Sequence, residues 1–556
     1  MKILFLMDSP EYLRFFDTVI EELIARGHDV SLTVGWGRER KHVGLEGLRT
    51  HVRGARVIGV APQTEGVWAD VAYRYRGIMD FVRYLHPTFA GATALRDRMK
   101  RKILPSTFRW LDAVKRLSPD AVRRIEQALM VGERAIPLSR PIVEFLRGEA
   151  PDVLFLSPLV AAGSPQVDWI KAARTLGLRT AVGVASWDNL TNKGLMRIEP
   201  DLVLVWNEAQ KQEACEYHYM PAAKVFATGA QPFDRWFTKH VTRDRDAFCA
   251  RVGLPDSRPF VVFTGSSVFI SRSNAEVPFV RQWIGALRAS GDPLLERVNI
   301  LMRPHPYNFH GWAVDRLTDL PGASVFPTQG YSQLDEANRA DFFDTLYHSA
   351  AVVGVNTSAM VEAAILGRPV FSILSTQFSG TQEGTIHFRH LLPENGGFLR
   401  IASGFDEHVR QLSAQLADPE GAQAETRRFV ASFLRPRGID RPATPIFADA
   451  LEGLAAAPAP VPVWPPAWGV ALRPLILAAS VPQSVATSVK KWRKKVGKPS
   501  RLIVRGARRA SRGARSATKE LSKAGRHASA WLRWGAKIAG KRWQKVVVKP
   551  LRPRRD

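Results

Sequence analysis

The chain begins with two short apolar segments that are separated by a stretch of helical periodicity. The first segment is MKILFLM, at residues 1–7, and the second is HDVSLTV, at residues 28–34. Between them, apolar residues recur at helical spacing until Gly27. A strand that is apolar on both faces and is followed by a helix predicts the βαβ unit of a parallel sheet. This pattern restricts the fold more than any other feature, because it predicts an α/β protein.

The same alternation recurs in two series. The first series extends to residue 230 and the second begins at residue 259, with a connection at residues 231–258. The sequence therefore predicts two successive parallel-sheet domains, 1–230 and 259–454. Residues 66–148 interrupt the first series with Trp, Tyr, Arg and Leu at helical spacing and no convincing strand. We predict a helical insertion there.

Two further segments follow the second domain. Residues 455–489 begin with a proline-rich stretch that is incompatible with a helix or a central strand, which predicts a stiff linker. Residues 490–556 contain 24 of the 79 Lys and Arg residues but two of the 52 acids, so they carry +22 of the net charge of +27. Four tryptophans lie among these cations. That combination is typical of an amphipathic segment at an anionic membrane surface.

The composition argues against several classes of protein. Two cysteines, Cys215 and Cys249, cannot form a disulfide framework or a thiolate metal centre, which fits a reducing cytoplasm. No window approaches the ~18 uninterrupted apolar residues of a transmembrane helix. Asp8 interrupts the first apolar run before the core of a signal peptide can form. Outside residues 490–556 the chain is nearly neutral, which argues against nucleic acid as a partner.

Three polar loops follow strands of the second domain, where parallel sheets bind ligands. Small residues allow backbone amides to approach an anion, and hydroxyl groups add hydrogen-bond donors. Each loop taken alone also fits an ordinary turn or helix cap. Together they predict a site for a nucleotide diphosphate. The candidate residues are Gly265, Ser266, Ser267, Arg303, His305, Asn356, Thr357 and Ser358.

Two further candidates for donor binding lie near these loops. Glu362 follows Ser358 by four residues. Its carboxylate can accept hydrogen bonds from ribose hydroxyls, or it can simply favour the start of a helix. The loop at residues 376–388 is rich in Gly, Thr and Gln. This composition suits hydrogen bonding to a polyhydroxyl group through Gln382 and Glu383, although a plain surface loop is similar.

Polar residues also follow two strands of the first domain. Two acids come after the first strand, and the sequence SWDN comes after the strand near residue 180. An aromatic ring beside a carboxylate and an amide is typical of carbohydrate contact and of a general base, with an ordered turn as the alternative. The candidate acceptor-side residues are Ser186, Trp187 and Asn189, and the candidate bases are Asp188, Glu11 and Asp8.

No spacing of His, Cys, Asp or Glu predicts a metal site, and no cofactor is expected. Asp244-Arg245-Asp246 has the spelling of the DxD motif of metal-dependent sugar transferases. It precedes a helix between the domains and does not end a strand, so we predict a solvated helix start. His218 lies at a helix end and is expected to be a cap or core residue.

These residues resemble the GT-B superfamily of nucleotide-sugar glycosyltransferases. The opening MKILFLMDSPEYLRFFDTVIEELIARGHDVSL resembles its strand–loop–helix start. RPHP followed by NTSAMVEAAILGRPVFSIL is similar to the donor half of bacterial surface-polysaccharide enzymes and of the related CDP-glycerol glycerophosphotransferases. The resemblance covers about residues 1–435 without the insertion. It implies two Rossmann-like domains that face a cleft, the acceptor domain first and the nucleotide-donor domain second.

The resemblance also implies roles for individual residues. Arg303 and His305 are expected to contact the donor pyrophosphate. Thr357 and Ser358 are expected to supply hydroxyl and amide donors, and Glu362 to hold the ribose. A valine stands eight residues after Glu362, so the paired glutamates of many retaining members are absent. Inversion is therefore favoured.

The function implied is metal-independent transfer of a sugar from a nucleotide-activated donor to a cell-surface glycan or lipid-linked acceptor. The alternatives are a glycerophosphotransferase, a non-hydrolysing sugar epimerase, which needs no acceptor, and a nucleic-acid-binding protein, which only the basic segment suggests. With residues 490–556 as a lipid-binding segment, we expect a bacterial cytoplasmic protein attached peripherally to the inner face of the cell membrane.

Overall fold

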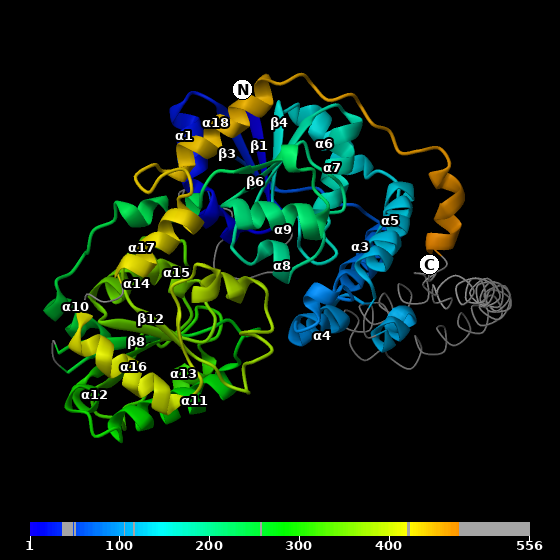
Figure 1. The fold of residues 1–556 in the computed structure, drawn as a ribbon. Coiled ribbons are helices and arrows are strands. Elements are labelled where there is room, and N and C mark those ends of the chain that lie inside the picture. Colours follow the sequence, from blue (N-terminus) through cyan, green and yellow to red (C-terminus); the bar gives the residue numbers. More distant parts are fainter. Residues whose placement is uncertain are drawn as a thin grey trace, which may run out of the picture. The chain divides into compact units, whose positions relative to one another are not determined.

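The computed structural model describes residues 1–35, 48, 52–104, 106–114, 117–255, 258–419 and 423–477. The chain divides into two units, Met1–Arg473 and Pro474–Asp556. The basic segment 490–556 belongs to the second unit and lies outside the described residues. The first unit contains two α/β lobes (Figure 1).

Seven parallel strands form the sheet of the amino-terminal domain, in the order β3-β2-β1-β4-β5-β6-β7. The central strands are apolar over residues 3–7 and 153–156 because helices cover both faces of the sheet, and Phe5 lies beside Leu32 and Phe155 in register. The strands are β1 (Lys2–Met7), β2 (Asp29–Val34), β3 (Arg56–Val60), β4 (Val153–Ser157), β5 (Arg179–Gly183), β6 (Leu202–Val205) and β7 (Val225–Ala227).

Six parallel strands form the sheet of the carboxyl-terminal domain, in the order β10-β9-β8-β11-β12-β13. The two-domain α/β fold predicted from the sequence is therefore confirmed. The strands are β8 (Phe260–Thr264), β9 (Asn299–Arg303), β10 (Ala323–Val325), β11 (Ala351–Gly354), β12 (Val370–Ile373) and β13 (Arg400–Ala402).

Helices surround both sheets, and among the described residues none is long and apolar enough to cross a membrane. In the first domain they are α1 (Asp17–Ala25), α3 (Val67–Arg83), α4 (Thr93–Lys102), α5 (Pro119–Ala135), α6 (Arg140–Glu149), α7 (Gln166–Thr175), α8 (Asn189–Asn192) and α9 (Glu208–His218). They continue with α10 (Arg245–Val252), α11 (Ser273–Arg288), α12 (Pro293–Arg297), α13 (His310–Val314), α14 (Glu336–His348), α15 (Ala359–Ile365), α16 (Phe405–Ala417), α17 (Gln423–Phe429) and α18 (Ala443–Ala456). Two 3-10 helices matter below, η1 (Pro10–Phe15) and η5 (Gln231–Phe237).

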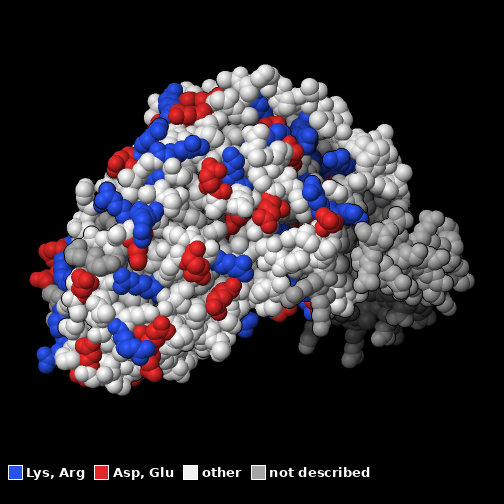
Figure 2. All heavy atoms as spheres, in the orientation of Figure 1, with Lys and Arg blue, Asp and Glu red and all other residues white. Residues whose placement is uncertain are grey.

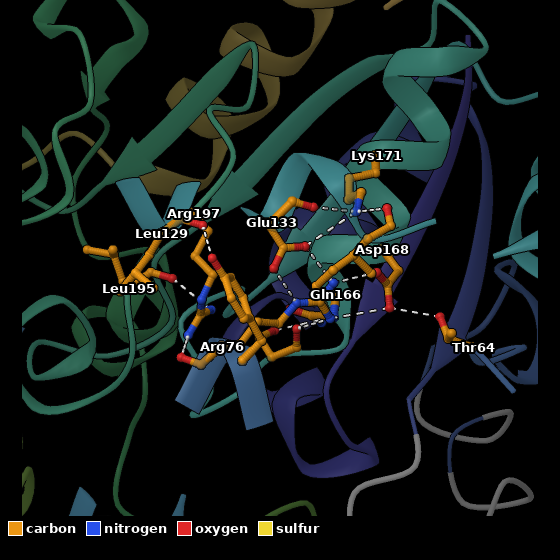
Figure 3. A network of polar contacts seen from close by, with 12 residues as sticks. Thr64, Arg76, Leu129, Glu133, Gln166, Asp168, Lys171, Leu195 and Arg197 are labelled. Carbon is orange, nitrogen blue, oxygen red and sulfur yellow. Dashed lines mark hydrogen bonds and ion pairs between the residues drawn. The ribbon is translucent and has the colours of Figure 1, made fainter. Parts of the chain in front are cut away.

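The helices α3 to α6 interrupt the first sheet between β3 and β4, and buried charges attach them to it (Figure 3). Arg76 of α3 pairs with Glu133 of α5 at 2.8 Å and with Asp168 of α7 at 2.5 Å. Lys171 of α7 pairs with the same Glu133 at 3.4 Å. Burial would raise the pKa of both carboxyls, but Arg76 lowers it, so both stay ionised. Removing one partner would leave a buried charge uncompensated, so the network fixes the insertion in place.

The chain crosses between the domains twice, and Asp234 of η5 joins the two crossings. Its carboxylate accepts hydrogen bonds from the backbone amides of Ala443 at 3.0 Å and Thr444 at 2.6 Å, and from Arg435 at 3.1 Å. The helix α18 follows the second sheet in sequence but packs on the first domain beside α1 (Figure 1). There the ring of Phe447 lies 6.0 Å from that of Phe16.

Residues 457–463, the strap, continue along the amino-terminal domain after α18. Arg179 donates to the carbonyl of Ala457 at 3.0 Å, and the amide of Val463 donates to the carbonyl of Arg174 at 2.9 Å. The next residues expose large apolar side chains, since Trp464 is 68% exposed. This part of the predicted linker is thus bound to the first domain by hydrogen bonds of its backbone groups, one of them to the side chain of Arg179.

Candidate active site between the two domains

Two adjoining cavities lie at the carboxyl ends of the sheets. The interdomain cavity has a volume of about 440 Å³ and is lined from both domains. The N-terminal cavity has a volume of about 1350 Å³ and extends from the end of β1 to the insertion helices. Such strand ends are where open parallel sheets bind ligands. The residues that line both cavities are Arg14, Phe15, Ser186 and Gln333.

The loops after β8 and β9 form one wall of the interdomain cavity. The amide of Gly265 donates to the carbonyl of Arg303 at 2.8 Å. A Cβ atom on Gly265 would lie 2.8 Å from the backbone nitrogen of His305, so glycine is needed for the two loops to pack this closely. His305 lines the cavity, and its Nδ1 accepts a hydrogen bond from the amide of Tyr307 at 3.2 Å.

Arg303 lines the same wall, but its side chain contacts mainly residues of its own domain. It is 3% exposed, and it donates to the hydroxyl of Thr345 on α14 at 2.8 Å. Its guanidinium also lies 5.1 Å from the ring centroid of Phe342 and 5.6 Å from that of Tyr331. These contacts give Arg303 a structural role in addition to any contact with a ligand.

Thr357, Ser358 and Glu362 come from the end of β11 and from α15, and all three line the interdomain cavity. Burial raises the pKa of Glu362 to about 7, and the nearby Arg14 partly offsets this effect. The carboxylate makes no hydrogen bond within the described part of the chain. A carboxyl group in this state can accept hydrogen bonds from a ligand that enters the cavity.

Five of the predicted donor-side residues do not line the cavity. The backbone amide of Ser266 donates to the carboxylate of Glu276 at 2.8 Å and is therefore not available to a ligand. Ser267 does not line the cavity either. Asn356 donates to the carbonyl of Thr381 at 2.7 Å. Gln382 donates to the backbone of β12 and its neighbours, and Glu383 is exposed. Asn356 and Gln382 therefore hold the loop at residues 376–388 against the sheet.

The three candidate bases, Asp8, Glu11 and Asp188, all line the N-terminal cavity. Burial would raise the pKa of Asp188, but Lys193, His387 and hydrogen bonds from Ser186 and Asn192 lower it to about 2. A carboxylate with so low a pKa is a weak general base at neutral pH. This low pKa argues against Asp188 as the base.

The candidate acceptor-side residues fall into different places. Ser186 lines both cavities, whereas Trp187 lines only the interdomain cavity and is 4% exposed. Asn189 lines the N-terminal cavity, but its side chain is already hydrogen-bonded. Its Nδ2 donates to the carboxylate of Asp188 at 3.2 Å, and its Oδ1 accepts from the backbone amide of Ala185 at 3.3 Å. Only Ser186 therefore lies where the two cavities meet.

Sequence reasoning missed several charged residues of the interdomain cavity. Asp17 of α1 accepts hydrogen bonds from Arg235 of η5 at 2.9 Å and from Arg339 of α14 at 3.3 Å, which connects both domains. Another is Arg14, whose position is described below. A single arginine in a helical stretch carries no spacing signal, so only its place after a strand end could have indicated it.

The predictions about Asp244 and His218 concern residues outside the cavities. The carboxylate of Asp244 accepts a hydrogen bond from the amide of Ala247 at 2.8 Å and so caps α10. His218 is 1% exposed and accepts a hydrogen bond from the amide of Met196 at 3.0 Å. In the described part of the chain, no cluster of three His, Cys, Asp or Glu residues has metal-binding geometry.

No protein-family model and no curated protein matches the sequence. Similar solved structures include UDP-GlcNAc 2-epimerase from Neisseria meningitidis bound to UDP-GlcNAc, at 12% identity and a TM-score of 0.48, over 81% of this chain and 100% of that chain. A putative UDP-N-acetylglucosamine 2-epimerase from Listeria monocytogenes has 11% identity and a TM-score of 0.48, over 83% and 99%. The calicheamicin glycosyltransferase CalG4 has 13% identity and a TM-score of 0.42, over 82% and 99%.

Similarities at this level do not transfer a reaction or a substrate. The fold instead follows from the two sheets, their parallel order and the return of α18 to the first domain. The chain has a GT-B-like fold, with two Rossmann-like domains that face each other across a cleft.

Proposed function

We propose that the protein is a metal-independent glycosyltransferase that moves a sugar from a nucleotide-activated donor to a cell-surface glycan or lipid-linked acceptor. The observation that carries the proposal is that the two cavities share lining residues, among them Arg14 and Ser186. A donor in the interdomain cavity can therefore meet an acceptor in the larger cavity. A sugar epimerase has no need of a second substrate cavity, so the pair of cavities favours a transferase.

The chemistry of the interdomain cavity suits a nucleotide donor. Glu362 would accept hydrogen bonds from ribose hydroxyls, because its carboxylate has no other hydrogen bond in the described part of the chain. Thr357, Ser358 and His305 would donate to the diphosphate. Such donors stabilise the charge that develops on a leaving group when no metal assists.

The opposing domain would supply the base for an inverting displacement. Asp8 or Glu11 would accept the proton of the acceptor hydroxyl, and the acceptor oxygen would attack the anomeric carbon on the face opposite to the diphosphate. This arrangement agrees with the positions of both acids in the N-terminal cavity, which adjoins the cavity that Glu362 lines.

A lipid-linked acceptor would be reached from a membrane surface. The segment 490–556, with a charge of +22, would attach the protein peripherally to anionic lipid at the cytoplasmic face, since each Lys or Arg near such a surface contributes about 1 kcal/mol. On the face of the first unit shown in Figure 2, positive and negative side chains are interspersed. The body therefore offers no broad basic area there that would replace the segment.

The experiment is product analysis by mass spectrometry with full-length protein. UDP-, GDP-, CDP- and TDP-sugars and CDP-glycerol are each incubated with a membrane extract that contains lipid-linked glycans. Transfer of a sugar to an extract component supports the proposal. Conversion of the donor sugar into its epimer without an acceptor, or transfer of glycerol phosphate alone, would assign one of the rival reactions instead.

A further inference from the structure

Arg14 lies at the junction of the two cavities, where η1 follows β1. Its Nε is buried and has no hydrogen-bond partner. Among the described residues its guanidinium makes no ion pair either, and it lies 4.5 Å from the ring centroid of its neighbour Phe15. A buried guanidinium nitrogen without a hydrogen-bond partner is costly, so its retention needs a reason.

The other cations of the interdomain cavity already have partners. Arg235 and Arg339 pair with Asp17, and Lys239 pairs with Glu336 at 3.2 Å. Arg303 donates to α14, as described above. Arg303 makes no ion pair among the described residues, but its guanidinium is held by α14, whereas that of Arg14 makes neither an ion pair nor a hydrogen bond there.

The surroundings of Arg14 favour an anion that comes from outside. Burial lowers the pKa of its guanidinium, whereas Tyr307 and Glu362 raise it and Arg339 lowers it further. Glu362 does not compensate the charge fully, since its own pKa is raised to about 7 and it makes no hydrogen bond to Arg14. An anionic ligand would supply the missing partner and would face hydrogen-bond donors fixed in the protein.

We propose that Arg14 binds the diphosphate of the nucleotide donor and stabilises it as the leaving group, from the domain opposite to the rest of the donor site. The inference rests on the proposed function. In that reaction the acceptor loses its proton to a carboxylate of the N-terminal cavity while its oxygen bonds to the anomeric carbon. The bond from that carbon to the diphosphate oxygen breaks, and its electron pair stays on this oxygen, where Arg14 donates hydrogen bonds.

The junction is where this bond must lie. The nucleoside and diphosphate fill the interdomain cavity, the acceptor fills the larger one, and the sugar carbon that changes partners lies between them. Arg14 is the cation that lines both cavities and makes no ion pair within the described residues. A planar guanidinium also matches the oxygens of a phosphate better than an ammonium does.

The test compares wild type, Arg14→Gln, Arg14→Lys and the control Arg124→Gln, an exposed arginine of α5, all as full-length chains. Isothermal titration measures binding of UDP, CDP, GDP and TDP and of the four nucleosides without phosphate. For the nucleotide that wild type prefers, we expect Arg14→Gln to weaken diphosphate binding by about 10-fold or more, with the nucleoside unaffected. Arg14→Lys keeps part of the affinity, and the control behaves as wild type.

Thermal melting without ligand gives a second readout. Because Arg14 has no protein partner, Arg14→Gln is expected to melt at the same temperature as wild type or higher. Equal diphosphate affinity in wild type and Arg14→Gln would overturn the inference and leave the proposed function standing. Failure of wild type to bind any of the four diphosphates would overturn the proposed function, and the role of Arg14 with it.

Discussion

The indole of Trp187 meets the imidazole of His387 edge to face, with ring centroids 4.8 Å apart. The two residues come from different domains, and His387 is 2% exposed. Burial lowers the pKa of His387 to about 4, although Asp188 opposes this effect, so the ring is neutral at neutral pH. The aromatic residue that the sequence suggested as a platform for a sugar is therefore part of the packing between the domains.

Trp187→Ala is expected to lower the free energy of unfolding by about 3 kcal/mol or more, because a large buried side chain is replaced by a cavity. Urea unfolding followed by circular dichroism measures this change. Trp464→Ala is the matched control, since its side chain is 68% exposed and its loss should change stability little. A stable Trp187→Ala protein that has lost only acceptor affinity would restore the platform interpretation.

His305 and Arg303 are expected to differ when each is replaced by alanine. His305→Ala should reduce transfer by about 10²-fold with little change in melting, as for loss of one donor to a leaving group. Arg303→Ala should lower both transfer and stability, because the hydrogen bond to Thr345 and the contact with Phe342 are lost as well. Steady-state kinetics and thermal melting separate the two effects. Wild-type kinetics for His305→Ala would remove it from the donor site.

Glu362 is expected to make stability depend on pH. Its pKa is raised from 4.5 to about 7, so folding favours the protonated form. The stabilisation is fully present below the unfolded pKa and is lost as the pH rises through 7, by at most about 3 kcal/mol at ~1.4 kcal/mol per pKa unit. Urea unfolding at pH 5 and pH 8 should show that the free energy of unfolding falls less between these two pH values for Glu362→Gln than for wild type. The exposed Glu383→Gln should match wild type, and an unchanged slope in Glu362→Gln would contradict the assignment.

Excess chelator is expected to leave transfer at full rate. Asp244 caps α10 through the amide of Ala247, so its carboxylate has a structural task at a helix start. Asp246→Asn should likewise keep its activity. Loss of transfer in chelator that Mg²⁺ or Mn²⁺ restores, together with inactive variants of both acids, would show that the metal-independent mechanism is wrong.

The sequence predicted the sheets well because a buried parallel strand must be apolar on both faces, and runs such as residues 2–7 have few other interpretations. It missed β13, because a three-residue strand that begins with Arg400 has no such run. It also could not predict which domain α18 packs on, because a helix with one apolar face can pack on either. In the structure, Phe447 packs against Phe16 and Phe155 of the first domain.

The candidate site was harder to predict for the same physical reason. A strand-end position indicates that a residue is near the cleft, as for Thr357 and Glu362, but not which way its side chain points. Asn356 and Gln382 have the same residue types as ligand-binding groups, yet their hydrogen bonds go to their own domain. Arg14 lacked any motif, and the interdomain cavity that it lines is completed by a domain that follows it by more than 200 residues.

Full-length protein is expected to bind vesicles of anionic lipid and to be released at high salt, whereas a chain that ends at Arg473 should not bind. The cut belongs after Arg473, because the strap is hydrogen-bonded to the first domain and its removal would disturb it. Vesicle sedimentation measures binding, with zwitterionic vesicles as the control. Equal binding by both chains would refute a role for residues 490–556.

The path of the chain after the strap determines which domain an attachment through residues 490–556 would hold. Arg473 donates to the carbonyl of Ala135 on the insertion at 3.0 Å, so the chain leaves the first unit from the amino-terminal domain. A partner that binds the chain beyond that point would therefore hold the amino-terminal domain. The carboxyl-terminal domain is joined to the amino-terminal domain by the two crossings at Asp234 and by contacts such as that of Trp187 with His387. A protein attached to a surface through residues beyond Arg473 would thus be held by its amino-terminal domain, and its carboxyl-terminal domain would be connected to that surface only by way of the amino-terminal one.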